Sequence, residues 1–289
     1  MAAVTPAQTI TDELRRWIVS QAEAGCPPEE MVAAMCRSGW AEAAALQALE
    51  DSLRAQLRVV AAERQAAALP AGPMPEPDLA NGPSMLMVDG HPVQVLLSMQ
   101  RPRLVLFGNL LSADECDALV EQARPRLLRS ETVDTATGGS EVNTARTSDG
   151  MFFTRGESAL IEGIERRLAT LLRWPVERGE GLQVLHYRPG AEYRPHHDYF
   201  DPEQPGSAAV LSRGGQRLAT LVVYLSTPAA GGATVFPDVG IDVAPVKGHA
   251  VFFSYDRAHP STRTLHGGAP VLAGEKWVAT KWLREGRFE

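Results

Sequence analysis

The chain contains few cysteines, and their spacing does not suggest a disulfide framework. Only Cys26, Cys36 and Cys116 occur among the 289 residues, and no two of them form a C-x-x-C motif. An odd number of widely spaced cysteines is typical of proteins from reducing compartments, where thiols stay free. We therefore expect free thiols and a cytoplasmic location.

Long apolar segments are also missing. No stretch approaches the roughly 20 consecutive apolar residues that a membrane-spanning helix requires. Residues 1–16 contain no basic segment followed by an apolar core, so we expect no secretory signal. A membrane is accordingly not an expected partner.

The chain has no excess of positive charge. Lys and Arg number 28 against 35 Asp and Glu, which gives a formal net charge of -7. Nucleic acids and anionic membranes select for clusters of Lys and Arg, so we expect neither as the main partner. The hydrophobic share of 44% and the charged share of 22% are ordinary for a soluble protein with a sizeable core.

Residues 1–65 are predicted to form a small all-α helical bundle. Leu14, Trp17 and Ile18 recur at helical spacing, and Pro28 with two following acids suits the first turn of a second helix. A third helix is expected from Trp40 through Leu57. Three short amphipathic helices with a Gly turn resemble a ubiquitin-associated domain in their pattern.

Residues 66–84 differ in composition from what precedes and follows them. They contain five prolines and few large apolar residues, which is typical of a semi-extended linker that packs poorly. We therefore place the domain boundary here and expect a second domain over residues 85–289.

This second domain alternates short β-type runs with Gly/Pro turns, and helical patterns interrupt them early. Ser112 followed by Glu115 predicts a capping box at the start of the first of these helices. The pattern predicts an α+β domain, an antiparallel double-stranded β-helix (jelly roll) with supporting helices. The expected helices are 112–124 and 156–172, and the expected strands are 103–107, 182–187, 218–225, 233–236, 250–254 and 276–283.

The most informative segment contains His196, His197 and Asp198. In a strand, residues two apart point to the same face, so His196 and Asp198 can converge on one ion while His197 points away. Two imidazoles and one carboxylate leave three open positions on an octahedral ion, as in non-haem Fe(II) oxygenases. A third ligand has to come from elsewhere, and the histidines downstream are His249, His259 and His266.

Residues 100–286 resemble the prolyl 4-hydroxylase family of 2-oxoglutarate oxygenases. The likeness rests on His196-x-Asp198, on His266, and on Lys276 ten residues beyond it. Further matching motifs occur in the family's order: Arg146-Thr-Ser-x-Gly-x-Phe, Glu180-x-Leu-Gln-Val-x-x-Tyr187, Gly-Gly-Gln-Arg217-x-Ala-Thr, Gly-Gly-x-Thr234-Val-Phe-Pro and Leu-His266-Gly-Gly.

The resemblance implies roles for particular residues. It makes His196, Asp198 and His266 the metal ligands and Lys276 the partner of the far carboxylate of 2-oxoglutarate. Strand parity agrees, because Lys276 shares a face with Val278, Thr280 and Trp282, whereas Lys281 lies on the other face. The resemblance also implies that Tyr187 and Thr234 give hydroxyls to the cosubstrate. Trp282 is expected on the inward side of the same strand as Lys276.

Substrate contacts are implied by the same likeness. Arg217, Glu180 and Tyr193 match positions that line the channel for a peptide, although a structural salt bridge or packing would account for them as well. Two long polar segments, 130–150 and 201–215, match loops that fold over the peptide in the family.

The implied function is hydroxylation of prolyl residues, at the 4-position, in a peptide or protein. The implied cofactors are Fe(II), the cosubstrate 2-oxoglutarate, O2 and ascorbate, and the products include succinate and CO2. One alternative is the same chemistry on a non-prolyl or small-molecule substrate. A second is a non-catalytic interaction protein that acts through the N-terminal bundle.

Overall fold

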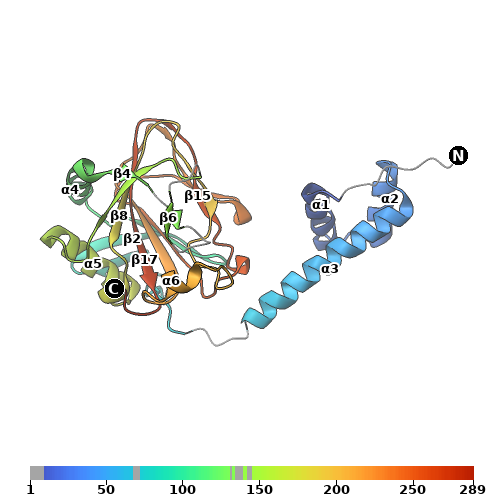
Figure 1. The fold of residues 1–289 in the computed structure, drawn as a ribbon, viewed down its shortest axis with the longest axis horizontal. Coiled ribbons are helices and arrows are strands. Elements are labelled where there is room, and N and C mark those ends of the chain that lie inside the picture. The colour runs from blue at the N-terminus through green and yellow to red at the C-terminus, as the bar shows by residue number, and fades with distance from the viewer. Residues whose placement is uncertain (1–9, 68–71, 131, 134–138, 142–144) are drawn as a thin grey trace. The chain divides into compact units, whose positions relative to one another are not determined.

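A computed structural model describes residues 10–67, 72–130, 132–133, 139–141 and 145–289 of the chain (Figure 1). The chain divides into two compact units, residues 1–70 and 71–289. Within the described residues, no helix combines the length and apolar character needed to cross a membrane.

The first unit contains three helices, α1 (Asp12–Glu23), α2 (Pro28–Arg37) and α3 (Glu42–Ala67). They enclose a small core of their own, whose fully or nearly fully buried members include Ile18, Met31, Met35, Ala45 and Ala48. Helix α3 continues well beyond the predicted Leu57, whose side chain is 68% exposed. Alanine, glutamate, arginine and glutamine favour helix without a partner surface, so propensity extends α3 beyond the core.

The predicted linker, residues 66–84, is only partly a linker in the structure. Residues 72–84 belong to the second unit, and Pro75 and Pro77 are buried there. The Glu76 carboxylate pairs with Arg103, and its backbone N–H donates to the Leu172 carbonyl. Prolines exclude regular structure but not burial, which is why composition alone overstated the length of the linker.

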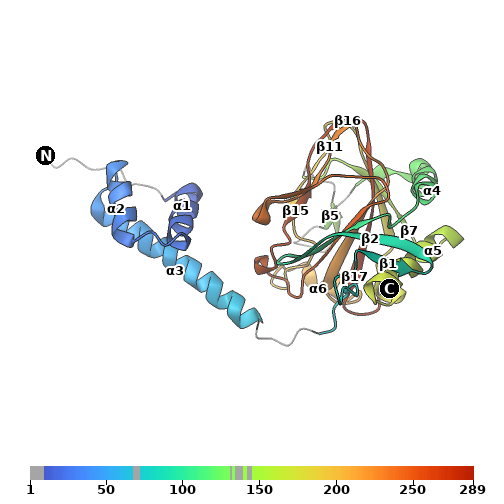
Figure 2. The ribbon, with the colours of Figure 1, turned by 180° about the vertical axis from the view of Figure 1, so that it is seen from behind.

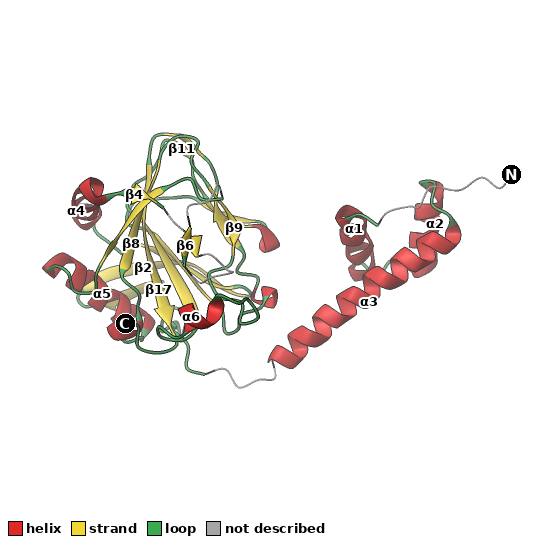
Figure 3. Ribbon diagram, in the orientation of Figure 1, coloured by secondary structure: helices red, strands yellow, loops and turns green. Residues whose placement is uncertain are grey.

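The second unit is built on a large antiparallel sheet that meets a smaller one (Figures 1 and 3). The large sheet runs, in spatial order, β1 (Met85–Val88), β2 (His91–Gln100), β3 (Arg103–Gly108), β14 (Ala250–Ser254), β10 (Arg217–Tyr224), β17 (Lys276–Arg284), β8 (Leu182–Tyr187), β7 (Asp149–Phe153) and β4 (Leu128–Arg129). The smaller sheet runs β13 (Ile241–Val243), β12 (Thr234–Phe236), β15 (His266–Gly268) and β9 (Tyr193–His196).

Two short strand pairs complete the sheets. They are β11 (Ala230–Gly231) with β16 (Val271–Ala273), and β5 (Thr132–Val133) with β6 (Ser140–Glu141). The double-stranded β-helix with supporting helices, predicted from the sequence, is confirmed. Every predicted strand of this unit has a counterpart. The strands without a predicted counterpart are β1, β2, β7 and β9 and the short strands β4, β5, β6, β11, β13, β15 and β16.

Helices cover the outer face of the large sheet, as Figure 2 shows from behind. They are α4 (Ala113–Ala123) and α5 (Ala159–Leu172). The unit also contains a short α6 (Ser207–Leu211) and the 3₁₀ turns η1 (Arg124–Arg126), η2 (Val176–Arg178), η3 (Pro237–Val239) and η4 (Pro260–Thr262). The predicted capping box is confirmed, because Ser112 and Glu115 each accept the other's backbone N–H.

The second unit has two apolar cores, one on each face of the large sheet. The first lies between the sheet and helices α4 and α5, with Leu119, Ile164 and Phe107 among its buried residues. The second lies between the two sheets and contains Tyr224 and Phe253. The space between the sheets is therefore where side chains from both can meet.

Candidate active site

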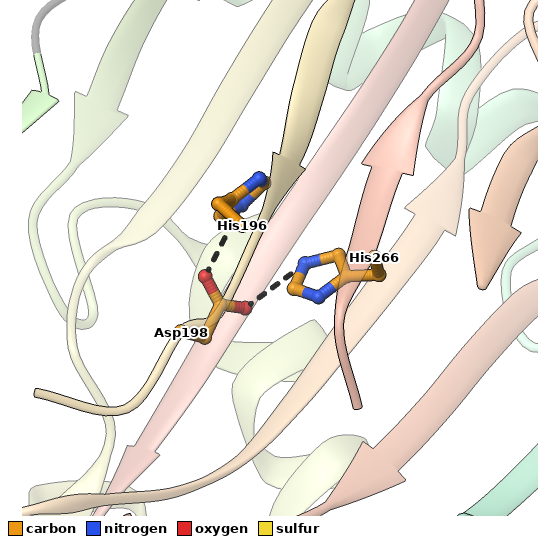
Figure 4. A group of neighbouring side chains, drawn as sticks. All are labelled: His196, Asp198 and His266. Carbon is orange, nitrogen blue, oxygen red and sulfur yellow. Dashed lines mark ion pairs between the residues drawn. The ribbon is translucent and has the colours of Figure 1, made fainter. Parts of the chain in front are cut away.

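Three potential metal ligands meet at the edge where β9 and β15 pair (Figure 4). His196 ends β9 and His266 begins β15, and the two residues lie directly opposite each other in the register. Asp198 follows two positions after His196. One ligand atom from each of the three residues lies within 4.8 Å of the others.

The hydrogen bonds of the two imidazoles set their tautomers. His196 Nδ1 lies 2.9 Å from the Arg194 carbonyl oxygen, and His266 Nδ1 lies 2.9 Å from that of Thr264. A carbonyl only accepts, so each Nδ1 carries the proton and each Nε2 presents a lone pair. Both Nε2 atoms face the Asp198 carboxylate, at 3.6 Å and 3.4 Å.

Lone pairs turned toward a carboxylate repel it unless a cation lies among them. The donor set of two neutral imidazoles and one carboxylate fits Fe(II) with open coordination positions. Backbone bonds at Nδ1 are the usual outer support of metal-binding histidines. The residues present therefore fit an iron site.

Asp198 is buried, with 6% of its surface exposed. Burial acts to raise the pKa of its carboxyl, but the neighbouring imidazoles of His266 and His196 outweigh burial and hold the pKa well below its usual range. Burial, reinforced by His266, lowers the pKa of His196. The pair of shifts favours an ionised carboxylate beside a neutral imidazole, the forms that bind metal.

Glycine at position 267 lets β15 approach β9 closely. A Cβ there would lie 2.8 Å from the Tyr193 carbonyl oxygen and 3.1 Å from the Pro195 nitrogen. Contacts that short between a side chain and a neighbouring backbone require the strands to separate. The Leu-His-Gly-Gly motif therefore supplies both a ligand and the close strand approach that holds it opposite His196.

Lys276 begins β17 and faces the same cavity from the large sheet. Its side chain is 3% exposed, and no described residue forms a hydrogen bond or ion pair with its Nζ. The Nζ instead lies 5.3 Å from the ring centre of Tyr187 and 5.9 Å from that of Tyr224. Burial lowers the pKa of Lys276 to about 8. A buried ammonium of this kind calls for an anionic ligand.

Polar groups for such a ligand surround Lys276. The cavity is lined by Tyr187 and Thr234, both predicted from the sequence, together with the three metal ligands. A third hydroxyl, that of Tyr224, was not predicted from the sequence. It donates a hydrogen bond to Thr234 Oγ1 at 2.8 Å. Alternation along β10 places Tyr224 on the same face as Thr220 and Val222. Because β10 is buried on both faces, its sequence shows no apolar–polar alternation that would identify the face toward the cavity.

Lys281 lies on the opposite face of β17. It is 3% exposed and pairs with the buried Glu165 of α5 at 2.5 Å. Lys276, Val278, Thr280 and Trp282 all line the cavity.

The predicted substrate contacts Arg217 and Glu180 are bonded to each other. Arg217 Nε lies 2.7 Å from Glu180 Oε1, and Arg284, which was not predicted, donates to the same oxygen at 2.7 Å. The guanidinium of Arg217 stacks 4.0 Å above the ring of Trp282. All four residues line a groove outside the metal site, so a substrate contact by Arg217 or Glu180 stays a prediction.

Tyr193 separates the groove from the inner cavity. Its ring stacks on the His196 imidazole with ring centres 3.7 Å apart. The central carbon of the Arg146 guanidinium lies 4.9 Å from the centre of the Tyr193 ring. Tyr193 and Trp282 line both the cavity and the groove. Of the two expected loops, 201–215 borders the groove and contains α6, whereas 130–150 lies partly outside the described residues.

Comparisons with known proteins agree with the geometry. Residues 182–284 match the family described as the 2OG-Fe(II) oxygenase superfamily. Prolyl 4-hydroxylase 5 of Arabidopsis thaliana is 40% identical over 209 residues, which are 65% of this chain and 70% of that protein. Prolyl 4-hydroxylase 1 of the same plant is 43% identical over 202 residues, 64% of this chain and 69% of that protein.

Among solved structures, the viral collagen prolyl hydroxylase of Paramecium Bursaria Chlorella virus-1, in its 2OG complex, is similar with 31% identity and a TM-score of 0.47. The likeness covers 63% of this chain and 95% of that one. The sequence relatives show the family: this chain belongs to the prolyl 4-hydroxylase family of Fe(II)- and 2-oxoglutarate-dependent dioxygenases.

Proposed function

We propose that this dioxygenase hydroxylates prolyl residues of a peptide or protein at the 4-position. The observation that carries the proposal is the convergence of His196, Asp198 and His266 beside Lys276, a buried lysine without an ion-pair partner among the described residues. Relatives named as prolyl 4-hydroxylases support the choice of substrate.

Iron bound by the three ligands supplies the oxygen chemistry, in which one atom of O2 enters the substrate and the other enters succinate as 2-oxoglutarate loses CO2. His196, Asp198 and His266 would hold the iron and leave positions on it for the cosubstrate and O2. The rest of the site is then left with three tasks: binding the cosubstrate, keeping water out and presenting the substrate carbon.

Lys276 and its neighbours would bind the far carboxylate of 2-oxoglutarate. The ammonium would pair with it, while hydroxyls from Tyr187 and Thr234 would donate hydrogen bonds. The Tyr224 hydroxyl already donates to Thr234 and so fixes the orientation of that hydroxyl. The aromatic walls keep the pocket dry, which strengthens these charge-assisted contacts.

The groove outside the metal site would receive an extended peptide. It runs from the metal ligands past Tyr193 and Trp282 to the segment 201–215. The compact pyrrolidine ring of proline would fit against the aromatic rings at this position, because its apolar CH₂ groups pack well on an aromatic face. Loop 201–215 borders the groove and would help to select the residues that flank the proline.

The experiment that tests the proposal measures succinate release by iron-reconstituted enzyme with a panel of proline-containing peptides. Mass spectrometry of each peptide reports a gain of one oxygen atom. We expect succinate and the mass gain in equal amounts, and amino-acid analysis should identify 4-hydroxyproline. Succinate without peptide oxidation would reject the prolyl substrate and leave the oxygenase chemistry.

Two variants test the assignment of the ligands. His196→Ala and His266→Ala should each abolish succinate formation and peptide oxidation, because two protein ligands hold Fe(II) too weakly. His249→Ala serves as the matched control, since His249 contributes nothing to the ligand cluster. Normal turnover by either ligand variant would overturn the assignment.

We propose ascorbate as an additional cofactor and the cytoplasm as the location. The three cysteines are unpaired in the structure, which supports a reducing compartment. Undiminished turnover over many cycles without ascorbate would count against the first proposal, and fractionation of cells with the protein in a secreted fraction would count against the second.

A further inference from the structure

We propose that Thr220 and Tyr255 form a positioning pair that fixes the orientation of the Asp198 carboxylate. The inference rests on the proposed function, in which Asp198 is a metal ligand. Neither residue is a predicted site residue, and neither reaches the metal position itself. They act through the ligand.

The three side chains form a short buried chain of hydrogen bonds. Thr220 Oγ1 lies 2.6 Å from Asp198 Oδ2, and the Tyr255 hydroxyl lies 2.9 Å from Thr220 Oγ1. Thr220 is 0% exposed and Tyr255 is 1% exposed. Thr220 belongs to β10 and Tyr255 directly follows β14, so the large sheet holds both donors rigidly beneath a ligand carried by the small sheet.

The direction of the two hydrogen bonds follows from the donors available. A metal-binding carboxylate is ionised and only accepts, so the single proton of the Thr220 hydroxyl goes to Asp198. The oxygen of Thr220 is then left as an acceptor, and the Tyr255 hydroxyl has to donate to it. Each hydroxyl thus polarises the next, which strengthens the bond to the carboxylate.

The consequence concerns the two oxygens of Asp198. Thr220 engages Oδ2, which also lies 3.4 Å from His266 Nε2, whereas Oδ1 lies 3.6 Å from His196 Nε2 and has no hydroxyl partner among the described residues. Oδ1 therefore keeps more of its lone pairs free for an ion. A carboxylate held in this way binds an ion through one oxygen. If the hydroxyl were removed, Oδ2 would become a buried, unpaired acceptor, and the carboxylate would rotate to offer both oxygens to the metal.

Thr220→Val is a clean test, because valine keeps the shape and the second methyl-sized branch but replaces the hydroxyl. Thr220→Ser is the matched counterpart, since it keeps the hydroxyl and loses a methyl group. Tyr255→Phe removes only the outer hydroxyl. Circular dichroism and thermal melts of the metal-free proteins establish that each variant folds.

The readout is anaerobic binding of Co(II) as a spectroscopic substitute for Fe(II), followed by its visible absorption bands. We expect Thr220→Val to weaken Co(II) binding by about 10-fold to 100-fold, the usual effect of removing an outer partner of a metal ligand. The bands should change in intensity, because a second carboxylate oxygen alters the coordination. Thr220→Ser should restore both properties to those of the unaltered protein.

A wild-type Co(II) affinity and spectrum in Thr220→Val would overturn the proposal, as would a Thr220→Ser variant that behaves like Thr220→Val. A lower melting temperature with unaltered Co(II) bands would mean that Thr220 is merely structural. Failure of the unaltered protein to bind Co(II) would instead refute the proposed metal site. The two failures are therefore distinguishable.

The role of Tyr255 is tested with a double-mutant cycle. If Tyr255 acts through Thr220, Tyr255→Phe should weaken Co(II) binding in the unaltered chain but have no further effect in Thr220→Val. Additive losses would show that Tyr255 acts on the site by another route, and would remove it from the pair.

Discussion

Lys276 and Lys281 lie on one strand and are both 3% exposed, yet their surroundings assign them different tasks. Lys281 has a buried carboxylate partner in Glu165, whereas Lys276 faces the metal cavity with aromatic rings around it. Burying an ammonium without a partner is unfavourable, so the position of Lys276 is suited to an anionic ligand. Two matched substitutions separate the roles.

Lys276→Met should raise the KM for 2-oxoglutarate by about 30-fold, because it removes a charged hydrogen bond worth about 2 kcal/mol. Its melting temperature should not fall, since the substitution removes a buried charge that has no partner in the part of the chain that the structure describes. Lys281→Met should do the reverse and destabilise the protein by about 3–5 kcal/mol, because it leaves Glu165 buried and unpaired. Steady-state kinetics and thermal melts distinguish the two, and a shared phenotype would contradict the assignment.

The pH dependence of cosubstrate binding follows from the same lysine. Burial lowers the pKa of Lys276 to about 8 in the ligand-free protein, so the side chain is charged at pH 7 and loses its charge as the pH rises through 8. The Kd for 2-oxoglutarate should therefore increase about tenfold per pH unit above 8. Lys276→Arg should keep its charge and show no such rise up to pH 9.5. Titration calorimetry makes the comparison, and equal profiles would exclude Lys276 as the titrating group.

The candidate site could be predicted where ligands are close in sequence or carry a motif. His196 and Asp198 follow from strand parity, whereas parity alone left three histidines open as the third ligand, and only the family motif singled out His266. Tyr224, Thr220 and Tyr255 were missed because a buried hydroxyl on a strand, or directly after one, looks in the sequence like any other core residue. Their roles depend on which strands are neighbours in space, and the sequence does not state that order.

At the scale of elements, the β1–β2 hairpin was missed despite a clear signal. Asp89 and Gly90 join the two strands with positive φ values of 51° and 78°. An Asp-Gly pair between apolar runs is the strongest short-range hairpin signal, because both central residues of the tight turn need such φ values. The hairpin begins directly after the expected linker, and none of the predicted strands includes residues 85–100.

The predicted strands were found because apolar runs of four to eight residues between Gly/Pro turns have few other conformations available. Strand β9 has no such run, since Tyr193–His196 includes a proline and polar residues that serve the site. The strand that carries a metal ligand is thus the one that β-strand propensity predicts least well. Residues that serve the site stand at positions where a strand would otherwise have β-branched or aromatic residues.

Two glycine substitutions test the account of the elements. Gly267→Ala should destabilise the protein by about 1–3 kcal/mol, because its Cβ would overlap the backbone of β9. It should also weaken metal binding, since His196 and His266 lie opposite each other across that strand pair. Gly163→Ala, in α5, meets nothing within 4 Å and should stabilise the protein by about 0.5–1 kcal/mol. Denaturant titrations that ranked the two variants in the opposite order would contradict the account.

At the scale of the whole molecule, the position of the boundary predicts which truncations are tolerated. Removal of residues 1–70 should leave the melting temperature of the dioxygenase unit and its affinity for 2-oxoglutarate unchanged, because that unit has its own cores. Removal of residues 1–84 should lower the melting temperature by about 5 °C or more, since it strips Met74, Leu79 and the Glu76 ion pair from the unit.

Differential scanning calorimetry of the two truncated proteins makes this comparison, and equal melting temperatures would contradict it. The shorter truncation also tests the N-terminal bundle. If the bundle recruits a protein substrate, the KM for that substrate should rise while the KM for a short peptide stays the same. An unchanged KM for both would exclude recruitment.

The pairing of His196 with His266 across β9 and β15 makes iron a check on assembly. A slip of one residue between these strands would turn one imidazole to the opposite face, and the slipped sheet would keep most of its hydrogen bonds while losing the ion. Iron should therefore bind only to molecules in which β9 and β15 pair in the correct register. A preparation in which β9 and β15 pair out of register should then bind less metal than one in the correct register.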